Sequence, residues 1–490
     1  MSEPIHCIEA IRAIEAHYLP GAQPTLMERA GRAAADWALE LLPGRSGPIL
    51  VAVGPGNNGG DALVAARHLK AAGREVVCAL AGDPQRFPAD AAAAWQAWRD
   101  AGGESVTKLP ERAWALAIDG LFGIGLKRPP EGLPLEWIDR LGRLDCPVLA
   151  LDLPSGLDAD SGQVLGRAVR ASHTLTFIGL KPGLLTLDGP DHCGEIRIAD
   201  LGLPAWPSPG QRISVEDFRG ELKPRPRNSH KGDWGEVGIL GGAPGMLGAA
   251  WLAGRAALAL GAGRVYVGAL DESAPALDPL HPELMMVSAE EVAGHASVLA
   301  VGPGLGRSET ALRLLRAALD FQGPLLLDAD ALNLLGSDPQ LEQGVRARTR
   351  PTILTPHPAE AARLLQQSTR EVQNDRLKAC RALAARYRCE VVLKGCGSIL
   401  ASPDGAWAIN TSGHPGMGAA GMGDVLSGLV ASLLAQGWEA RQALHGGVHL
   451  HGAAADACSA AGCGPIGLSA SELIGSARAT YNRWLLRSNA

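Results

Sequence analysis

The chain has 490 residues, and its 45 Lys and Arg against 51 Asp and Glu give a formal net charge of −6 at pH 7. So small a charge argues against a nucleic-acid-binding protein, which usually carries a basic surface. Apolar residues make up 46% of the chain, enough for hydrophobic cores, and a chain of this length favours more than one domain.

The cysteines and the N-terminal residues indicate in which cellular compartment we expect the protein. The 9 cysteines include no Cys-x-x-Cys pair, and an odd, scattered set is a poor disulfide framework, so we expect a reducing, cytoplasmic setting. Glu3, His6, Glu9 and Arg12 interrupt the region where a signal peptide needs an apolar run. No apolar stretch approaches the about 18 residues of a membrane span, so we expect no membrane association.

In the first half, apolar strand patterns alternate with helical ones. A helix is predicted after Thr25, which would form a capping box with Glu28, and a second helix over 61–72. The predicted strands are 49–53, 75–80, 114–118, 147–153 and 174–178. This alternation predicts an α/β fold with a mostly parallel sheet covered by helices on both faces.

A Pro-rich, polar segment from about 203 to 232 has no sustained period, and we interpret it as a domain boundary. The alternation then resumes. The predicted strands are 236–240, 264–269, 298–301, 324–328, 352–355, 390–394 and 397–401, and the predicted helices are 247–260, 309–319, 359–367, 424–436, 445–461 and 469–486, the last with a Ser469–Glu472 capping box. The sequence therefore predicts two α/β domains, residues 1–212 and 213–490.

The segment GPGNNGGD follows the first predicted strand, and Gly54, Gly56 and Gly59 spell the dinucleotide fingerprint G-x-G-x-x-G. Glycines there allow close approach of a phosphate, although a ligand-free strand-to-helix turn would look the same. Asn57, Asn58 and Asp61 are not part of that fingerprint. Their oxygens suit a ribose, an amide or a hard monovalent cation.

Two more strand ends carry acids: Asp119, before a glycine turn with Lys127 and Arg128, and Asp152, before Ser155. Either acid alone could be a helix cap or a solvated loop residue. Three strand-end loops that each bring an acid or amide favour a ligand site at one edge of the sheet.

The segments GPGNNGGD, IDGLFGIGL, LDLPSGLDADSG and TFIGLKPG, in this order, resemble the NAD(P)H-hydrate epimerase domain, over most of residues 1–210. The resemblance implies a Rossmann-like α/β/α fold and a potassium ion held by Asn58, Asp119 and Ser155. It implies that the hydrated dinucleotide contacts Asn57, Asn58, Gly59, Gly60, Asp61, Gly123, Ile124, Gly125, Leu126, Lys127, Arg128, Pro129 and Asp152. Because epimerisation at C6 passes through a cationic ring, a carboxylate such as Asp152 can move the proton and stabilise the cation.

In the second half, GMGAAGMGDVLSG places Gly421, Gly423 and Asp424 at the start of a long apolar helix. The first amides of a helix can bind a phosphoryl group, and a neighbouring carboxylate can take the proton of an attacking hydroxyl. On the motif alone, Asp424 could instead be an ordinary N-cap. A G-x-G-D motif before a helix resembles the ribokinase-like kinases.

Further segments make the resemblance to the ribokinase-like kinases more specific. Residues of about 225–485 resemble the ADP- or ATP-dependent NAD(P)H-hydrate dehydratases, in the segment that begins at His230 and in VGPGLG, LDADALN, LTPHPAE and VLKGCGS. The resemblance implies that Ala249, Gly304, His357 and Asp424 contact the hydrated dinucleotide. It implies that Lys394, Gly395, Cys396, Gly397, Ser398 and Gly423 bind the adenine nucleotide, with Mg²⁺ on its phosphates.

We therefore predict a bifunctional enzyme that interconverts the R and S hydrates of NAD(P)H and dehydrates the S form. Single-chain fusions of this kind resemble bacterial enzymes that use ADP, so we favour ADP over ATP. We expect small-molecule substrates and a homo-oligomer. Two alternatives stay open: a ribokinase-like small-molecule kinase with an accessory N-terminal domain, and a first domain that binds without catalysing.

Overall fold

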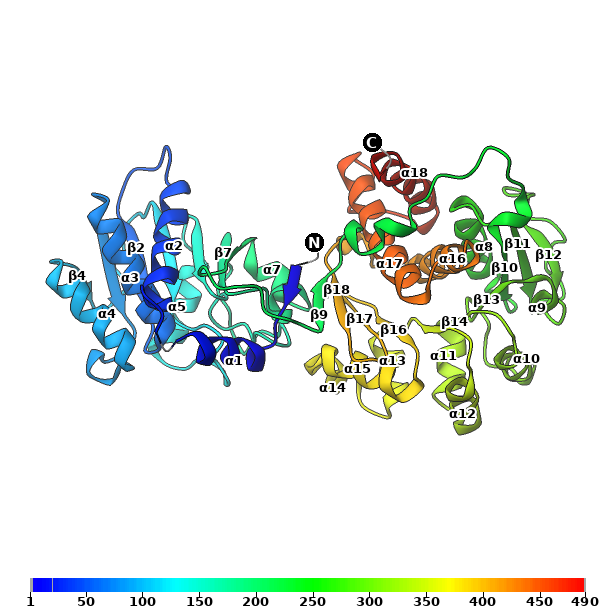
Figure 1. The fold of residues 1–490 in the computed structure, drawn as a ribbon, viewed down its shortest axis with the longest axis horizontal. Helices are drawn as coiled ribbons and strands as arrows, with labels where there is room; N and C mark the ends of the chain where they lie inside the picture. The colour runs from blue at the N-terminus through cyan, green and yellow to red at the C-terminus, as the bar shows by residue number, and fades with distance from the viewer. Residues whose placement is uncertain (1–2, 20, 489–490) are drawn as a thin grey trace. The chain divides into compact units, whose positions relative to one another are not determined.

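The computed structural model describes residues 3–19 and 21–488. The chain divides into two compact units: one is Pro4–Ser208, and the other begins at Pro209 and also takes in Glu3. Figure 1 shows a sheet with helices on both faces in each unit. No helix in the described ranges has the length and apolarity that a membrane crossing needs.

The sheet of the first unit has the order β4-β3-β2-β5-β6-β7-β8, and every neighbouring pair is parallel. Its strands are β2 (Ile49–Val53), β3 (Val76–Leu80), β4 (Glu104–Val106), β5 (Leu116–Gly120), β6 (Val148–Leu151), β7 (His173–Phe177) and β8 (Glu195–Ala199). The chain therefore starts at the centre with β2, runs to one edge, and returns to β5 beside β2. Such a reversal creates a crevice at the strand ends.

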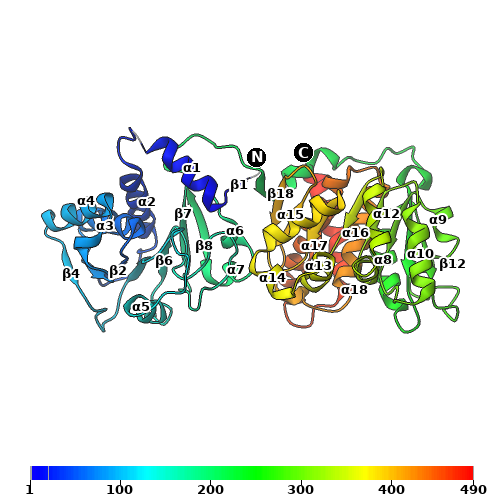
Figure 2. The same ribbon diagram turned by 90° about the horizontal axis from the view of Figure 1, so that it is seen from below.

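Helices cover both faces of this sheet (Figure 2). Val51 and Ile118 pack in one core with α2 (Leu26–Glu40), α3 (Asn57–Ala71) and α4 (Ala89–Asp100), whereas Leu50 and Ala117 pack in another with α5 (Leu133–Leu141). The remaining helices are α1 (Ile8–Tyr18), α6 (Pro182–Leu185) and α7 (Gly189–Cys193). The predicted three-layer α/β/α arrangement is confirmed.

Two local predictions in this unit were wrong. Helix α3 starts at Asn57, four residues before the predicted start at 61, because the amides of Gly59 and Gly60 both donate to Gly56 O and close a helical turn. Thr25 does accept a hydrogen bond from Glu28 N at 3.2 Å, but Glu28 does not complete a capping box. Its carboxylate binds Arg67 instead.

The sheet of the second unit runs β9-β18-β17-β16-β15-β14-β13-β10-β11-β12. Strand β1 comprises Glu3–Ile5. The strands from β10 to β16 are parallel, and β17 is antiparallel to both of its neighbours. The bounds are β9 (Gly210–Arg212), β10 (Glu236–Gly241), β11 (Arg264–Ala269), β12 (Met285–Ser288), β13 (Val298–Val301), β14 (Leu325–Leu327), β15 (Thr352–Leu354), β16 (Glu390–Leu393), β17 (Ser398–Ala401) and β18 (Trp407–Asn410).

Four helices form one core with this sheet: α8 (Leu247–Ala259), α16 (Met422–Ala435), α17 (Ala440–Ala460) and α18 (Ala470–Ser488). The others are α9 (Val292–His295), α10 (Glu309–Leu319), α11 (Ala329–Leu335), α12 (Pro339–Ala347), α13 (Pro358–Leu365), α14 (Thr369–Asn374) and α15 (Arg376–Tyr387). The predicted Ser469–Glu472 capping box is confirmed, because each residue's backbone N–H donates to the other's side chain.

The segment 203–232 is more ordered than the sequence indicated. Strand β9 pairs with β18, and a 3-10 helix at Val215–Glu221 buries Phe218. A Cβ at Gly210 would lie 2.1 Å from the Trp407 ring, so a glycine lets this edge strand approach the sheet. The prolines still mark the change of unit, but the second unit starts inside the segment.

Candidate active sites

In the first unit, the loops after β2, β5 and β6 meet near the point where the strand order reverses. Gly54 N donates to Gly120 O at 3.1 Å. A Cβ at Gly123 would lie 3.0 Å from Asp152 Oδ2 and 3.4 Å from Asn58 Oδ1. The structure therefore brings Asn58, Gly123 and Asp152 together, as expected from the common edge of parallel strand ends.

The three fingerprint glycines have different roles. A Cβ at Gly54 would lie 1.8 Å from Leu121 O, and one at Gly59 would lie 2.1 Å from Gly54 O, so both serve the packing of the chain on itself. A Cβ at Gly56 would meet nothing within 4 Å. Gly56 is the N-cap of α3 and has no side-chain cap, so this helix start is open to a ligand.

Asp119 and Ser155 form a buried pair beside these loops. Ser155 Oγ donates to Asp119 Oδ1 at 2.6 Å, and Ser155 N donates to Oδ2 at 2.8 Å. Burial raises the pKa of Asp119 to about 6, although these hydrogen bonds oppose the shift. Among the described residues, Asp119 has no Lys or Arg partner, so its buried charge lacks compensation.

Asp152 follows β6 and is 7% exposed. Its φ of 66° lies in the left-handed region, which residues other than glycine rarely adopt. Oδ2 accepts a hydrogen bond from Ile124 N at 3.3 Å, and Oδ1 accepts one from Lys181 Nζ at 2.5 Å. Lys181 lies within the quoted TFIGLKPG segment, but no sequence pattern indicates that its side chain is buried against Asp152.

Two further carboxyls lie in the electrostatic field of Asp152. Burial raises the pKa of Asp61 well above its ordinary value, and the charge of Asp152 raises it further. The pKa of Glu15 is raised by the same two causes, which places α1 near the site. Glu15 was not predicted, because nothing in its helix marks it.

The charged part of the β5 loop behaves differently. Gly125, Lys127, Arg128 and Pro129 are exposed, and no described contact joins them to Asp152. The structure leaves these predicted ligand contacts free to meet solvent or a phosphate at the edge of the site.

In the second unit, the strand order reverses between β10 and β13, which are adjacent although β11 and β12 separate them in sequence. Ala243 N donates to Gly304 O at 2.6 Å. Gly304 has a φ of 60°, and a Cβ there would lie 2.5 Å from Met246 O and 3.2 Å from the Ala249 Cβ. The predicted residues Ala249 and Gly304 are therefore direct neighbours.

Asp424 lies in the first turn of α16, after an N-cap, Gly421, with φ 84° and no side-chain cap. Burial raises the pKa of Asp424 to about 7, and the negative charge of Asp328 contributes while Lys394 opposes it. A carboxyl with a pKa near neutrality is suited to accept a proton. A Cβ at Gly423 would lie 3.3 Å from Lys394 Nζ, so the two predicted nucleotide contacts adjoin.

Asp328 connects these groups and was not predicted as a site residue. Its Oδ1 accepts a hydrogen bond from Lys394 Nζ at 2.8 Å, and its Oδ2 accepts one from Ser427 Oγ at 2.8 Å. Burial alone would lower the pKa of Lys394, but the negative charges of Asp328 and Glu360 outweigh it and raise that pKa. The sequence signal that could have identified Asp328 is its place as an acid at the end of a predicted strand, in the segment LDADALN.

The loop Lys394–Ser398 is held by Arg376 at the start of α15. The guanidinium donates to Cys396 O at 2.6 Å, Lys394 O at 3.2 Å and Leu393 O at 3.3 Å. Within the loop, Ser398 Oγ donates to Gly395 O at 3.0 Å. Arg376 was also missed, because its burial depends on the fold.

His357 is the exposed N-cap of α13, and its Nδ1 accepts a hydrogen bond from Ala359 N at 3.1 Å. Its Nε2 lies 3.2 Å from Glu360 Oε1, and Pro356 O accepts a hydrogen bond from Lys394 N at 2.9 Å. The predicted substrate contact therefore belongs to the same group of loops as the nucleotide contact Lys394.

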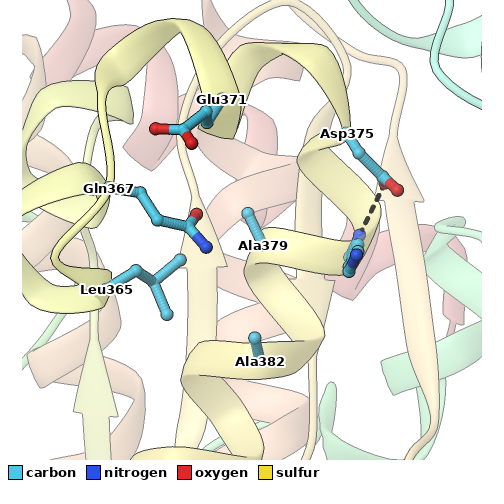
Figure 3. Close-up of a pocket in the computed structure, with 7 residues that line it drawn as sticks. Leu365, Gln367, Glu371, Asp375, Ala379 and Ala382 are labelled. Atoms are coloured by element: carbon cyan, nitrogen blue, oxygen red, sulfur yellow. Dashed lines mark hydrogen bonds between the residues drawn. The ribbon is translucent and has the colours of Figure 1, made fainter.

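A separate surface hollow of about 240 Å³ lies among α13, α14 and α15. Figure 3 shows its lining, in which Glu371 and Gln367 face Ala379, and the Asp375 carboxylate accepts a hydrogen bond from Lys378 N at 2.9 Å. None of the predicted site residues lines it, so we assign it no part in the two sites.

The comparisons define a class of protein. The chain matches the family model of a YjeF-related protein N-terminus over residues 23–183 and that of an NAD(P)H-hydrate dehydratase over residues 237–474. A ribokinase-like superfamily protein from Enterococcus faecalis is similar in structure, with 26% identity and a TM-score of 0.50 over 58% of this chain and 99% of that one. The predicted pair of α/β folds is thus confirmed.

Curated relatives make the class more specific. A bifunctional NAD(P)H-hydrate repair enzyme of Escherichia coli is 40% identical over 93% of this chain and 89% of its own length. Its counterpart from Coxiella burnetii is 38% identical over 93% and 94%. The chain belongs to the family of bifunctional NAD(P)H-hydrate repair enzymes.

Proposed function

We propose that the chain repairs hydrated nicotinamide dinucleotides: it interconverts the R and S hydrates of NAD(P)H and dehydrates the S form with ADP, giving AMP and phosphate. The observation that carries the dehydratase half is Asp424, a carboxyl with a pKa raised to about 7 at the open start of α16. We assign epimerisation to residues 1–212 and dehydration to residues 213–490.

The dehydration begins with phosphoryl transfer. The C6 hydroxyl oxygen attacks the terminal phosphorus of ADP, its proton passes to Asp424, and AMP leaves. The first amides of α16 stabilise the charge that develops on the phosphoryl oxygens. The C6–O bond then breaks with its electron pair on the phosphate while C5 loses a proton, which forms the C5–C6 double bond of NAD(P)H. Phosphate leaves readily, whereas hydroxide does not.

Lys394 and the loop after it are proposed to hold the nucleotide. The ammonium of Lys394 adjoins Gly423 at the helix start, where it can offset phosphate charge. Mg²⁺ bound to the nucleotide would neutralise further phosphate charge, with few protein ligands. The loop's amides are oriented by the bonds from Arg376 to its carbonyls.

Epimerisation requires that C6 lose and regain its oxygen. The ring nitrogen expels the protonated hydroxyl as water and forms a C6=N1 iminium, and water then adds to the other face and gives up a proton. We propose that Asp152 stabilises the cation and moves this proton, because Oδ2 faces the Gly123–Ile124 loop that we assign to substrate binding. One proton is consumed and one returned.

The residues proposed for a potassium ion fit that ion. Asn58, Asp119 and Ser155 offer amide, carboxylate and hydroxyl oxygens, and the buried charge of Asp119 lacks a cationic partner among the described residues. Bound there, potassium would compensate this charge and stiffen the loops. The buried Asn58 Nδ2 has no partner in the described structure and can donate to substrate. Epimerase rates in potassium, sodium and a bulky organic cation test this site.

The test of the function uses purified hydrated NADH of known epimer ratio, given with ADP or with ATP. We expect recovery of the reduced-nicotinamide absorbance coupled one-to-one to AMP from ADP, and consumption of both epimers. Disappearance of the S epimer alone would remove the epimerase. A stable phosphorylated alcohol with no NADH would favour the alternative, a ribokinase-like kinase.

The expectations about cellular location and oligomeric state remain predictions. We propose a cytoplasmic location, supported by the nine cysteines, which form no disulfide among the described residues. We also propose a homo-oligomer, supported only by exposed apolar side chains such as Leu280 and Ile466. Light scattering of the purified protein tests the second proposal.

A further inference from the structure

Lys181 carries a fully buried ammonium group in the first unit. The residue is 0% exposed, and its Nζ contacts three oxygens from two neighbouring segments. These are Asp152 Oδ1 at 2.5 Å, Phe177 O at 2.7 Å and Thr176 Oγ1 at 2.9 Å. Three acceptors use all three N–H bonds of an ammonium group, so Lys181 has no proton left to offer a substrate.

The two oxygens of Asp152 therefore have different surroundings. Oδ1 is taken by Lys181, whereas Oδ2 faces the loop of Gly123 and Ile124. The backbone of Asp152 is held in its left-handed conformation by a hydrogen bond from its N–H to Leu175 O at 2.7 Å. The short contact with Lys181, together with a longer hydrogen bond of 3.4 Å from Phe177 N to Oδ1, orients the carboxylate and therefore Oδ2.

The charges around this pair are mainly negative. Glu15 from α1 and Asp61 from α3 both interact with the charge of Asp152, and the pKa of each is raised by burial and by that charge. Lys181 is the sole Lys or Arg that forms an ion pair with Asp152 among the described residues. His6 also interacts with the charge of Lys181, and its pKa is lowered by burial and by that charge.

We propose that Lys181 is a positioning residue for epimerisation: it binds Oδ1 of Asp152 and so turns Oδ2 toward the substrate, without touching substrate itself. The proposal rests on the role of Asp152 in the proposed function. It makes Lys181 necessary for turnover rather than for substrate affinity, because none of its protons is available to the dinucleotide.

The first experiment measures epimerase kcat and KM, and the pH profile of kcat, for Lys181→Met in the full chain. We expect kcat to fall by about 100-fold, the lower range for a lost acid–base group, with KM unchanged. The pH profile of the remaining activity should differ from that of wild type, because the charges of Glu15, Asp61 and Asp152 then lack the compensating cation. Lys70→Met, an exposed lysine on α3, is the matched control and should behave as wild type.

A second pair of variants distinguishes a loss of positioning from a loss of folding. Thr176→Val removes one acceptor of Lys181 but keeps both charges, and we expect kcat to fall about fivefold, as for one hydrogen bond, with KM unchanged. Lys181→Met/Asp152→Asn should recover the thermal stability lost in Lys181→Met, since no unpaired carboxylate is then buried, yet stay inactive.

The possible outcomes distinguish an error in the proposed role of Asp152 from an error in the inference about Lys181. If Asp152→Asn retains epimerisation, the proposed role of Asp152 is wrong. If Asp152→Asn is inactive but Lys181→Met keeps the wild-type kcat and pH profile, only the inference about Lys181 is overturned. If Lys181→Met does not fold, a wild-type kcat for Thr176→Val overturns it.

Discussion

Asp328 at the end of β14 binds Lys394 at the end of β16 through an ion pair of 2.8 Å, although 66 residues separate them. Asp328 is 1% exposed, so its carboxylate cannot reorient toward solvent. The pair holds the Lys394 ammonium beside Gly423, where the phosphates of the nucleotide are proposed to bind.

Replacing Lys394 with Met should therefore disable dehydration. We expect kcat/KM for ADP to fall by about 100-fold, since one preorganised donor is lost from a partly buried site. Epimerase activity in the same polypeptide should not change. Lys378→Met, an exposed lysine on α15, serves as control. A normal ADP-dependent rate in Lys394→Met would mean that the nucleotide binds elsewhere.

The raised pKa of Asp424 predicts the pH dependence of dehydration. Its carboxyl must be ionised to accept a proton, and its pKa is about 7, so kcat/KM should rise with pH up to about 7 and then level off. Initial rates across this range check the prediction. An acid limb below about pH 5, near the ordinary value of an aspartate, would contradict it.

The same shift predicts a change in stability with the opposite trend. The folded pKa lies above the unfolded value of 3.8, so the folded state binds more protons between these limits. The free energy of unfolding should therefore decrease as pH rises through this window. Thermal unfolding at about pH 5 and about pH 8 should show a smaller loss in Asp424→Asn than in wild type. Equal losses in the two proteins would contradict the prediction.

The sequence predicted the part of each site that depends on local pattern. Asp119, Asp152 and Asp424 were predicted as site residues because an acid at a strand end or helix start lies where ligands bind in a parallel α/β sheet. Strands such as 264–269 and 298–301 agree with the structure because continuous apolar runs mark buried parallel strands.

The sequence could not predict contacts between residues that lie far apart along the chain. Lys181, Asp328 and Arg376 look like ordinary charged residues, and only the fold shows that each is almost fully buried against a loop of the site. The early start of α3 was missed because two glycines suggest a turn, whereas here Gly59 is required by its contact with Gly54 O.

Gly123→Ala tests the crowding around Asp152. The new Cβ would lie 3.0 Å from Asp152 Oδ2 and must displace it, and a displacement of this kind slows chemistry. We expect epimerase kcat to fall about tenfold or more, with normal thermal stability. Gly142→Ala is the matched control, because its Cβ would meet no atom closer than 3.6 Å. Equal rates for both variants would show that Oδ2 need not point at this loop.

Arg376→Met tests whether the carbonyl bonds of this guanidinium shape the nucleotide loop. Without them, the carbonyls of Lys394 and Cys396 lose their donor, and the loop's amides are no longer directed at the phosphates. We expect KM for ADP to rise about tenfold, the effect of one or two such bonds, with the epimerase rate unchanged. Arg381→Met, an exposed arginine on the same helix, controls for the loss of charge. A lower melting temperature with a wild-type KM would show that Arg376 stabilises the unit without shaping the site, because only an oriented loop changes the affinity for ADP.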